Sequence, residues 1–169
     1  MRRRSVGVII GVIGTSGADR RAARDAYEVG RLIARRGAVM ICGGLTGVME
    51  AAARGAREEG GLTIGVLPGD DPRQANPYID IPIVTGMGYA RNIIIVRSAR
   101  AVIAIGGSYG TLSEIAYALN LRVPLIGLGT WDIAKIDEGE TGMLMVKTPE
   151  EAVEEALKKI PNPKSQIPI

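Results

Sequence analysis

Continuous apolar segments, each ended by a cluster of glycines, are the feature that most restricts the fold of this chain. Three of these segments cover residues 5–13, 38–42 and 101–105. The clusters that end them are Gly14-Thr15-Ser16-Gly17, Gly43-Gly44-Leu45-Thr46-Gly47 and Gly106-Gly107-Ser108-Tyr109-Gly110-Thr111. A strand that is apolar on both of its faces is typical of a parallel sheet buried between two layers of helices.

Apolar residues recur at helical spacing after each glycine cluster, so a helix is predicted to follow each of these strands. The expected buried stripes are Ala22, Ala26, Val29 and Ile33, then Val48, Ala52 and Ala56, then Leu112, Ile115, Ala116 and Leu119. Further strands are predicted over residues 62–67, 81–85, 124–128 and 143–146. This alternation predicts an α/β fold: a three-layer Rossmann-like parallel sheet with helices on both faces, forming a single nucleotide- or phosphate-binding domain over residues 1–169.

Two more helices are predicted in the second half of the chain. Residues 89–99 fit either a buried strand or an apolar helix, and the alternation of elements favours the helix. Because residues 93–96 are too apolar for a helix that covers one sheet face, we expect its outer side to be buried against a second subunit. The last helix is predicted to begin after the N-cap Thr148, with Pro149 at its first position and Glu151 completing a capping box.

Absent residue types exclude several classes of protein. The chain has no histidine, which excludes histidine-bearing metal sites and imidazole catalysis. Cys42 is the single cysteine, so no intrachain disulfide can form and a cytoplasmic location is expected. The first lysine is Lys135, which excludes a P-loop with its Gly-Lys-Ser/Thr sequence. No apolar run reaches the ~20 residues of a membrane span, so we expect no membrane partner and no protein-bound metal.

The net charge of +3 is a mild basic excess. Arg2-Arg3-Arg4 is interpreted as a solvated arm rather than a nucleic-acid contact, because no aromatic-interleaved basic stripe follows it. We therefore expect a small phosphorylated molecule, and no nucleic acid, as the partner.

The three glycine clusters are predicted to share one edge of the sheet, since ligands bind outside the carboxyl ends of parallel strands. Backbone N–H groups and the positive end of a helix dipole favour an anion there, with plain turn chemistry as the alternative. The expected ligand- or phosphate-binding residues are Gly14, Thr15, Ser16, Gly43, Gly44, Thr46, Gly47, Gly106, Gly107, Ser108, Tyr109, Gly110 and Thr111. The spacing of residues 11–17 does not fit the dinucleotide fingerprint, which argues against a nicotinamide dehydrogenase.

Three motifs of this chain resemble those of a known superfamily. They are Gly43-Gly44-Leu45-Thr46-Gly47-Val48-Met49, Leu67-Pro68-Gly69 and Gly106-Gly107-Ser108-Tyr109-Gly110-Thr111-Leu112-Ser113-Glu114. The superfamily is the "lysine decarboxylase-like" Rossmann superfamily, which includes cytokinin-activating phosphoribohydrolases and molybdenum cofactor carrier proteins. The resemblance runs from about Val6 to Leu128 and is closest to the carrier branch, in residues 65–69, 81–86 and 90–92.

This resemblance implies two classes of function. The first is a binding or carrier protein for a phosphorylated, nucleotide-like ligand such as the molybdopterin cofactor. The second is a phosphoribohydrolase that cleaves nucleoside 5′-monophosphates, of the cytokinin riboside monophosphate or AMP type, to free base and ribose 5-phosphate. The relatives also imply a homo-oligomer, either a dimer or a tetramer.

The hydrolase motif fits this chain only in part. Arg91 and Glu114 match its catalytic pair for N-glycosidic bond cleavage. Gly106, Ser108 and Asn92 stand where that motif has proline, glycine and lysine, and these departures favour the carrier class. The label "lysine decarboxylase-like" would imply pyridoxal phosphate as a cofactor. Pyridoxal phosphate is held by a lysine, and no lysine lies in a glycine loop of this chain, so we expect no pyridoxal phosphate.

Several of these residues have a second interpretation. Glu114 also fits a capping box that starts at Thr111, and Arg91 taken alone fits a solvated helix arginine. Tyr109 fits a turn as well as a surface for a base or pterin ring. Asp70 and Asp71 are interpreted as a loop-capping pair.

Overall fold

The computed structural model describes residues 7–133 and 142–160 of the chain. These residues form a seven-stranded sheet in the order β4-β3-β2-β1-β5-β6-β7, in which every neighbouring pair is parallel. The strands are β1 (Ile9–Gly14), β2 (Val39–Cys42), β3 (Thr63–Leu67), β4 (Ile81–Val84), β5 (Ala101–Ile105), β6 (Leu125–Leu128) and β7 (Met143–Val146). All seven had been predicted, and β4 and β7 form the two edges of the sheet.

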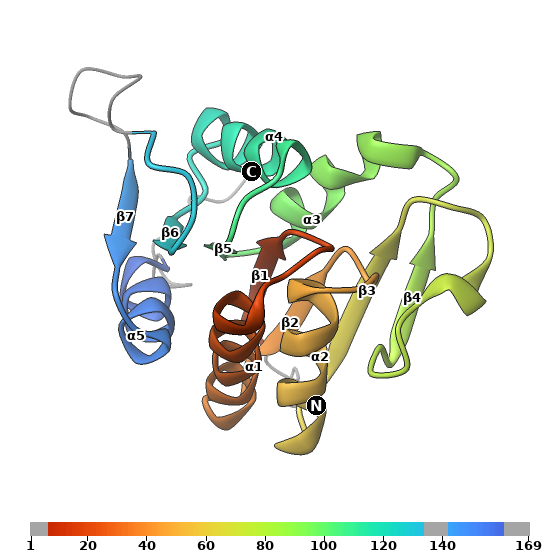
Figure 1. The fold of residues 1–169 in the computed structure, drawn as a ribbon, viewed down its shortest axis with the longest axis horizontal. Coiled ribbons are helices and arrows are strands. Elements are labelled where there is room, and N and C mark those ends of the chain that lie inside the picture. Colours follow the sequence, from red (N-terminus) through yellow and green to blue (C-terminus); the bar gives the residue numbers. More distant parts are fainter. Residues whose placement is uncertain (1–6, 134–141, 161–169) are drawn as a thin grey trace, which may run out of the picture.

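Helices cover both faces of this sheet, which confirms the predicted three-layer α/β class (Figure 1). They are α1 (Arg20–Arg35), α2 (Val48–Glu58), α3 (Asn92–Ser98), α4 (Tyr109–Asn120) and α5 (Pro149–Lys159), with short 3-10 helices η1 (Pro72–Gln74) and η2 (Gly88–Arg91). One face carries α1, α2 and α5, and the other carries α3 and α4. The ambiguous segment 89–99 is therefore helical, as η2 followed by α3. No helix among the described residues is long and apolar enough to cross a membrane.

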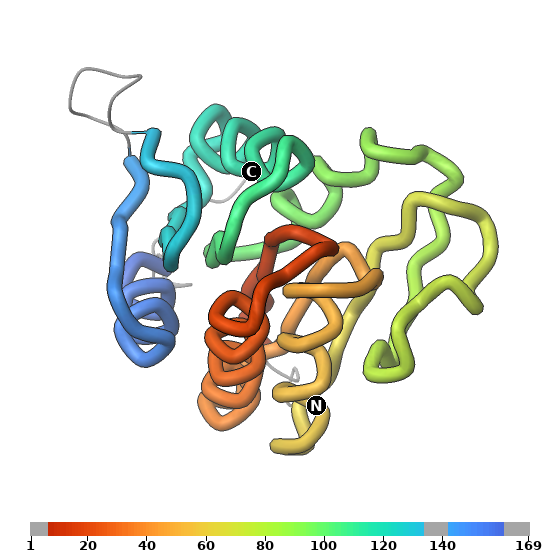
Figure 2. Tube along the Cα trace, in the orientation of Figure 1, coloured from red at the N-terminus to blue at the C-terminus, as the bar shows by residue number. Residues whose placement is uncertain are grey.

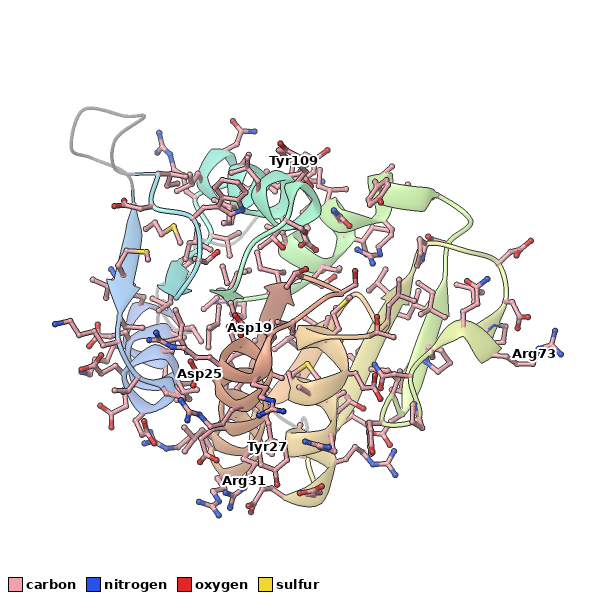
Figure 3. The ribbon with its side chains drawn as sticks, viewed as in Figure 1. Asp19, Asp25, Tyr27, Arg31, Arg73 and Tyr109 are labelled. Atoms are coloured by element: carbon pink, nitrogen blue, oxygen red, sulfur yellow. The ribbon has the colours of Figure 1, made fainter. Side chains whose placement is uncertain are left out.

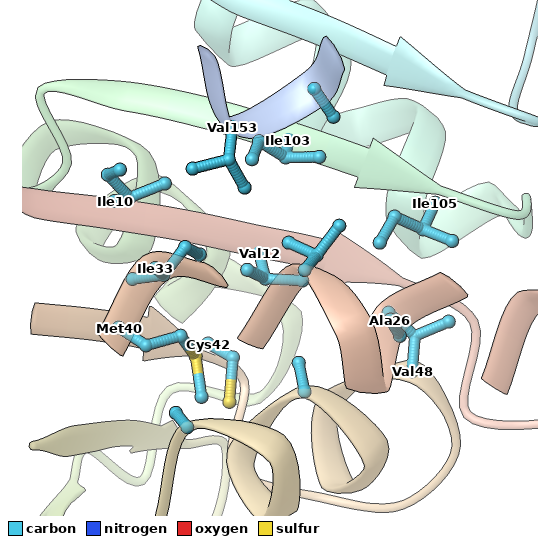
Figure 4. Close-up of a cluster of buried hydrophobic side chains, with 14 of the residues drawn as sticks. Ile10, Val12, Ala26, Ile33, Met40, Cys42, Val48, Ile103, Ile105 and Val153 are labelled. Atoms are coloured by element: carbon cyan, nitrogen blue, oxygen red, sulfur yellow. The ribbon is translucent and has the colours of Figure 1, made fainter. Parts of the chain in front are cut away.

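Strand β1 shows why its sequence is apolar on both faces. Ile10 and Val12 are buried in the core cluster under α1, α2 and α5 (Figure 4), whereas Ile13 is buried in the cluster under α3 and α4. Its neighbour β5 alternates in the same way, with Ile103 in the first cluster and Val102 in the second. Successive side chains of a strand point to opposite faces, so a central strand of a three-layer fold has no polar side.

Two glycines let helices α1 and α2 approach each other closely; the two lie side by side in the Cα trace (Figure 2). A Cβ atom on Gly30 of α1 would lie 2.0 Å from the carbonyl oxygen of Ala52 in α2. A Cβ atom on Gly55 of α2 would lie 2.0 Å from the carbonyl oxygen of Tyr27 in α1. The helix backbones are therefore in direct contact, and any side chain at either position would push them apart.

Two capping predictions, those for Thr148 and for Asp71, are confirmed. The Oγ1 atom of Thr148 accepts a hydrogen bond from the Glu151 N–H at 3.2 Å, and the Glu151 carboxylate accepts one from the Thr148 N–H at 3.3 Å, which is the expected capping box of α5. Asp71 caps η1 by accepting from the Arg73 N–H at 2.9 Å. The solvated arm predicted for residues 2–4 lies outside the described residues.

Replacing Gly30 with alanine tests the close helix contact. Alanine has the higher helix propensity, worth about 1 kcal/mol. The clash with the Ala52 carbonyl should outweigh that gain, because overpacking that shifts a backbone costs roughly 1–3 kcal/mol or more. We expect Gly30→Ala to lower the free energy of unfolding by about 2 kcal/mol in urea titrations. The matched control is Gly17→Ala, since nothing lies within 4 Å of a Cβ atom there. Equal stability of the two variants would contradict the contact.

Candidate ligand-binding site

The order of the strands brings the three glycine turns together at one edge of the sheet. Strand β1 pairs with β2 on one side and with β5 on the other, so the turns that follow them are neighbours. The Val48 N–H donates to the Thr15 carbonyl at 3.0 Å, and the Thr46 hydroxyl donates to the Ser16 carbonyl at 3.2 Å. Gly47 has φ +69°, and a Cβ atom there would lie 2.4 Å from the Thr15 carbonyl oxygen. Only glycine can hold the first two turns this close.

A cavity of about 340 Å³ lies at this edge. The residues that line it are Ile13, Gly14, Ser16, Gly43, Leu45, Met49, Tyr89, Arg91, Asn92, Ser108, Tyr109, Gly110, Thr111 and Glu114. All three turns contribute, and so do both members of the pair matched to the hydrolase motif. The sequence-predicted residues that share the cavity are Gly14, Ser16, Gly43, Ser108, Tyr109, Gly110, Thr111, Arg91 and Glu114.

Six other predicted binding residues lie behind this lining or beside it. They are Thr15, Gly44, Thr46, Gly47, Gly106 and Gly107. Thr15 accepts a hydrogen bond from the Gly17 N–H at 3.2 Å, so its hydroxyl shapes the first turn. Gly106 lines a separate pocket of about 200 Å³ that also includes Asp19 and Arg21. These residues form the turns, while their neighbours face the cavity.

Five lining residues were not predicted as binding residues. They are Ile13, Leu45, Met49, Tyr89 and Asn92. Ile13 and Leu45 adjoin predicted glycines, so their inclusion follows from the turns themselves. Tyr89 lies two residues before Arg91 at the start of η2, and this proximity is the signal that could have found it.

Arg91 and Glu114 form a buried pair at the back of the cavity. Arg91 ends η2 and Glu114 lies in the second turn of α4, two elements that cover the same face of the sheet. One Nη atom of Arg91 lies 3.8 Å from a carboxylate oxygen of Glu114, and the two residues are only 7% and 6% exposed. The interpretation of Arg91 as a solvated helix arginine is therefore wrong.

Burial dominates the electrostatics of this pair. It raises the pKa of Glu114 to about 8, although the Arg91 guanidinium acts in the opposite direction. Burial also lowers the pKa of Arg91, against the attraction of Glu114. The distance of 3.8 Å is too long for a strong charge-assisted hydrogen bond, so the attraction does not compensate for the loss of solvent. Glu114 is thus mostly protonated at neutral pH, and Arg91 retains its positive charge.

The remaining contacts of Arg91 fix its guanidinium beside the second and third turns. One Nη atom donates to the Gly43 carbonyl at 3.3 Å, and the other donates to the Asn92 side chain. The Asn92 amide donates to the Ser113 hydroxyl at 3.1 Å, which donates to the Gly110 carbonyl at 2.7 Å. The Arg91 Nε atom is buried and has no hydrogen-bond partner within residues 7–133 and 142–160. A donor of this kind is costly to bury unless something accepts from it.

The capping-box interpretation of Glu114 is wrong. Helix α4 begins at Tyr109, and its N-cap is Ser108, whose hydroxyl accepts from the Thr111 N–H at 3.5 Å. A capping box would place its acidic residue at the third helical position, which is Thr111. Glu114 is one turn further on, where its side chain points into the buried cavity rather than back to the helix start.

Two further features bear on metal binding and on thiol reactivity: the grouping of potential metal ligands and the burial of Cys42. Within residues 7–133 and 142–160, no group of three or more His, Cys, Asp or Glu side chains could hold a metal ion. Cys42 is fully buried at the end of β2, and burial raises the pKa of its thiol to about 12. The thiolate, which is the reactive form, is therefore scarce at neutral pH.

Residues 7–153 match the SLOG cluster4 family. The chain is 48% identical over 144 residues to an uncharacterized protein of Archaeoglobus fulgidus, a match that covers 85% of this chain and 91% of that protein. It is also 34% identical over 106 residues to a probable cytokinin riboside 5′-monophosphate phosphoribohydrolase of Oryza sativa subsp. japonica. That match covers 60% of this chain but only 47% of the rice protein.

Two solved structures resemble this one over almost its whole length. The molybdenum cofactor binding protein of Rippkaea orientalis has a TM-score of 0.87 and 38% identity, and the match covers 94% of this chain and 100% of that one. The molybdenum cofactor carrier protein of Chlamydomonas reinhardtii has a TM-score of 0.80 and 35% identity, covering 92% of this chain and 98% of that one. Both have the Rossmann-like fold described above.

The raised pKa of Glu114 predicts how stability depends on pH. Between the ordinary carboxyl pKa near 4.5 and about 8, the folded protein holds a proton that the unfolded chain releases. The contribution of Glu114 to the free energy of unfolding is therefore greatest below pH ~4.5. It falls as the pH rises and is lost above about 8, with a slope of at most about 1.4 kcal/mol per pH unit. Glu114→Gln should flatten this part of the profile, measured by urea unfolding from pH 5 to 8.5. The same slope in the variant and the wild type would count against a protonated Glu114.

Proposed function

Because the chain belongs to the SLOG cluster4 family, we propose that it is a binding or carrier protein for a phosphorylated, nucleotide-like small molecule, with a molybdenum cofactor as its cargo. One observation carries the proposal. A cavity formed by three glycine turns is lined by the buried Arg91, whose Nε atom finds no acceptor among the residues that the structure describes. A phosphate oxygen is the kind of acceptor that such a donor lacks.

The charges around the cavity favour an anion. Arg91 and Glu114 are the charged residues of its lining, and Glu114 is mostly neutral at physiological pH. The lining also includes residues 108–111, the start of the 12-residue helix α4. The first N–H groups of a helix lack partners within the helix, and its dipole makes this end positive. Arg91 and the start of α4 therefore both attract a negatively charged phosphate.

The comparisons favour carriage over hydrolysis. Relatives named as a molybdenum cofactor binding protein and a molybdenum cofactor carrier match over nearly the full length of both chains. This chain spans about half the length of the rice phosphoribohydrolase that it matches. The cavity volume of about 340 Å³ is within the usual range for small-molecule sites. The single buried, unpaired cysteine fits a cytoplasmic protein.

Hydrolysis of nucleoside 5′-monophosphates is the second candidate, because Arg91 and Glu114 line the same cavity at a distance of 3.8 Å. That chemistry uses a carboxylate to stabilise positive charge on the ribose ring or to orient water. Burial raises the pKa of Glu114, so the charged carboxylate that this role needs is disfavoured. We therefore expect binding without turnover at neutral pH.

The proposal is tested by offering the purified protein AMP and following both binding and turnover. We expect calorimetry to detect binding, and Arg91→Met, which keeps an unbranched apolar stem without the guanidinium charge, to weaken it about 10–100-fold. The matched control is Arg73→Met, an exposed arginine paired with Asp71 far from the cavity (Figure 3). Binding that survives Arg91→Met unchanged would contradict the proposed site.

The same sample decides between the two classes. Free adenine and ribose 5-phosphate are assayed after incubation with AMP and with N6-substituted analogues of AMP. We expect neither product to form. Formation of both products by the wild type, abolished in Glu114→Ala, would make the protein a phosphoribohydrolase and overturn the carrier assignment.

We also propose that the protein is a homo-oligomer, either a dimer or a tetramer. In α3, Ile95 and Val96 are buried, but Ile93 and Ile94 remain partly exposed. The edge strand β4 is exposed along its whole length and includes Ile81 and Ile83. Light scattering at micromolar concentration should give two or four times the mass of the chain, and a stable monomer would contradict this assembly.

A further inference from the structure

Two tyrosines stand almost fully exposed among the residues that line the cavity. Tyr89 is 84% exposed and Tyr109 is 85% exposed. Tyr109 is the first residue of α4, where Figure 3 labels it, so its backbone belongs to the helix start that we propose holds the phosphate. The inner part of the cavity is thus polar and cationic, whereas its outer part presents aromatic rings.

Trp131 supports the ring of Tyr109. The two rings are stacked, with centroids 6.5 Å apart and an angle of 26° between their planes. The Trp131 indole N–H donates to the Ser108 carbonyl at 3.3 Å, which ties the loop after β6 to the N-cap of α4. Gly107 makes room for this indole, because a Cβ atom there would lie 2.8 Å from the indole nitrogen.

This arrangement also explains two residues that phosphate binding leaves unexplained. Gly107 was predicted as a phosphate-binding residue, but it lies against Trp131 and not in the cavity lining. Trp131 was not predicted at all, although it fixes the same turn from outside. An exposed aromatic ring held in place by a second ring is a ready surface for stacking, since little conformational freedom remains to be lost on binding.

We propose that Tyr109, supported by Trp131, is the stacking surface for a planar heteroaromatic ring of the ligand, whose phosphate lies toward Arg91. This inference rests on the proposed function, since it assigns the two ends of the same ligand to the two parts of one site. Polar contacts from residues 108–111 hold the phosphate, and the ring of Tyr109 selects for a flat aromatic group. A phosphorylated sugar without such a ring fills only the inner part.

Affinities for AMP and for ribose 5-phosphate, which differ by the adenine ring, test the proposal. We expect AMP to bind about ten-fold more tightly than ribose 5-phosphate, the size of effect typical of one base stacked on an aromatic side chain. Tyr109→Ala should reduce this ratio to about one, and the conservative control Tyr109→Phe should retain it. Trp131 is the chain's single tryptophan, so AMP should also change the intrinsic fluorescence of the wild type.

The outcomes distinguish a failure of the proposed stacking surface from a failure of the proposed binding site. Equal affinities for the two probes in the wild type, or a ratio that persists in Tyr109→Ala, would overturn the stacking surface alone. A protein that binds neither probe would overturn the proposed function together with it. Loss of an oligomer in Tyr109→Ala, with the ratio unchanged, would show that the ring covers a second copy instead. Circular dichroism and thermal unfolding confirm that each variant is folded.

Discussion

The pairing of β1 with β2 on one side and β5 on the other is the constraint on which the rest of this structure depends. Parallel strands end at a common edge, so this pairing gathers three turns that lie up to about 90 residues apart in the chain. The helices that follow the first two turns, α1 and α2, are in direct backbone contact at Gly30 and Gly55. Glycine is required at these points because the space left between backbones admits no side chain.

Desolvation sets the chemistry of the cavity that results. Arg91 and Glu114 are both more than nine-tenths buried, and at 3.8 Å their attraction does not offset the loss of water around the carboxylate. The outcome is a neutral acid beside a permanent cation, which suits an anionic ligand better than a cationic transition state. A closer carboxylate–guanidinium contact would shift the balance toward an ionised Glu114.

Asn92 contributes to this balance through its position between two elements. It accepts from an Nη atom of Arg91 and donates to Ser113 on α4, so the guanidinium is tied to the helix that also carries Glu114. A lysine at this position would add a second positive charge next to Arg91, and a nearby positive charge favours the ionised form of a carboxyl group. Asparagine in place of the lysine of the hydrolase motif therefore affects the ionisation of the carboxyl group, and is not only a difference between families.

The sequence by itself determined the layers of the fold, the order of the elements and the turns that meet, because apolar periodicity and glycine placement report on local backbone geometry. It also pointed to Arg91 and Glu114, though through a motif rather than through any visible property of the residues. The roles of Tyr89, Asn92 and Trp131 were decided only in three dimensions. The alternative interpretation of Glu114 as part of a capping box stayed open because the local pattern fits two helix starts, and the actual start at Tyr109 places Glu114 in the cavity lining instead. Burial and partners depend on which distant segments pack together, and periodicity along one segment carries no information about its neighbours.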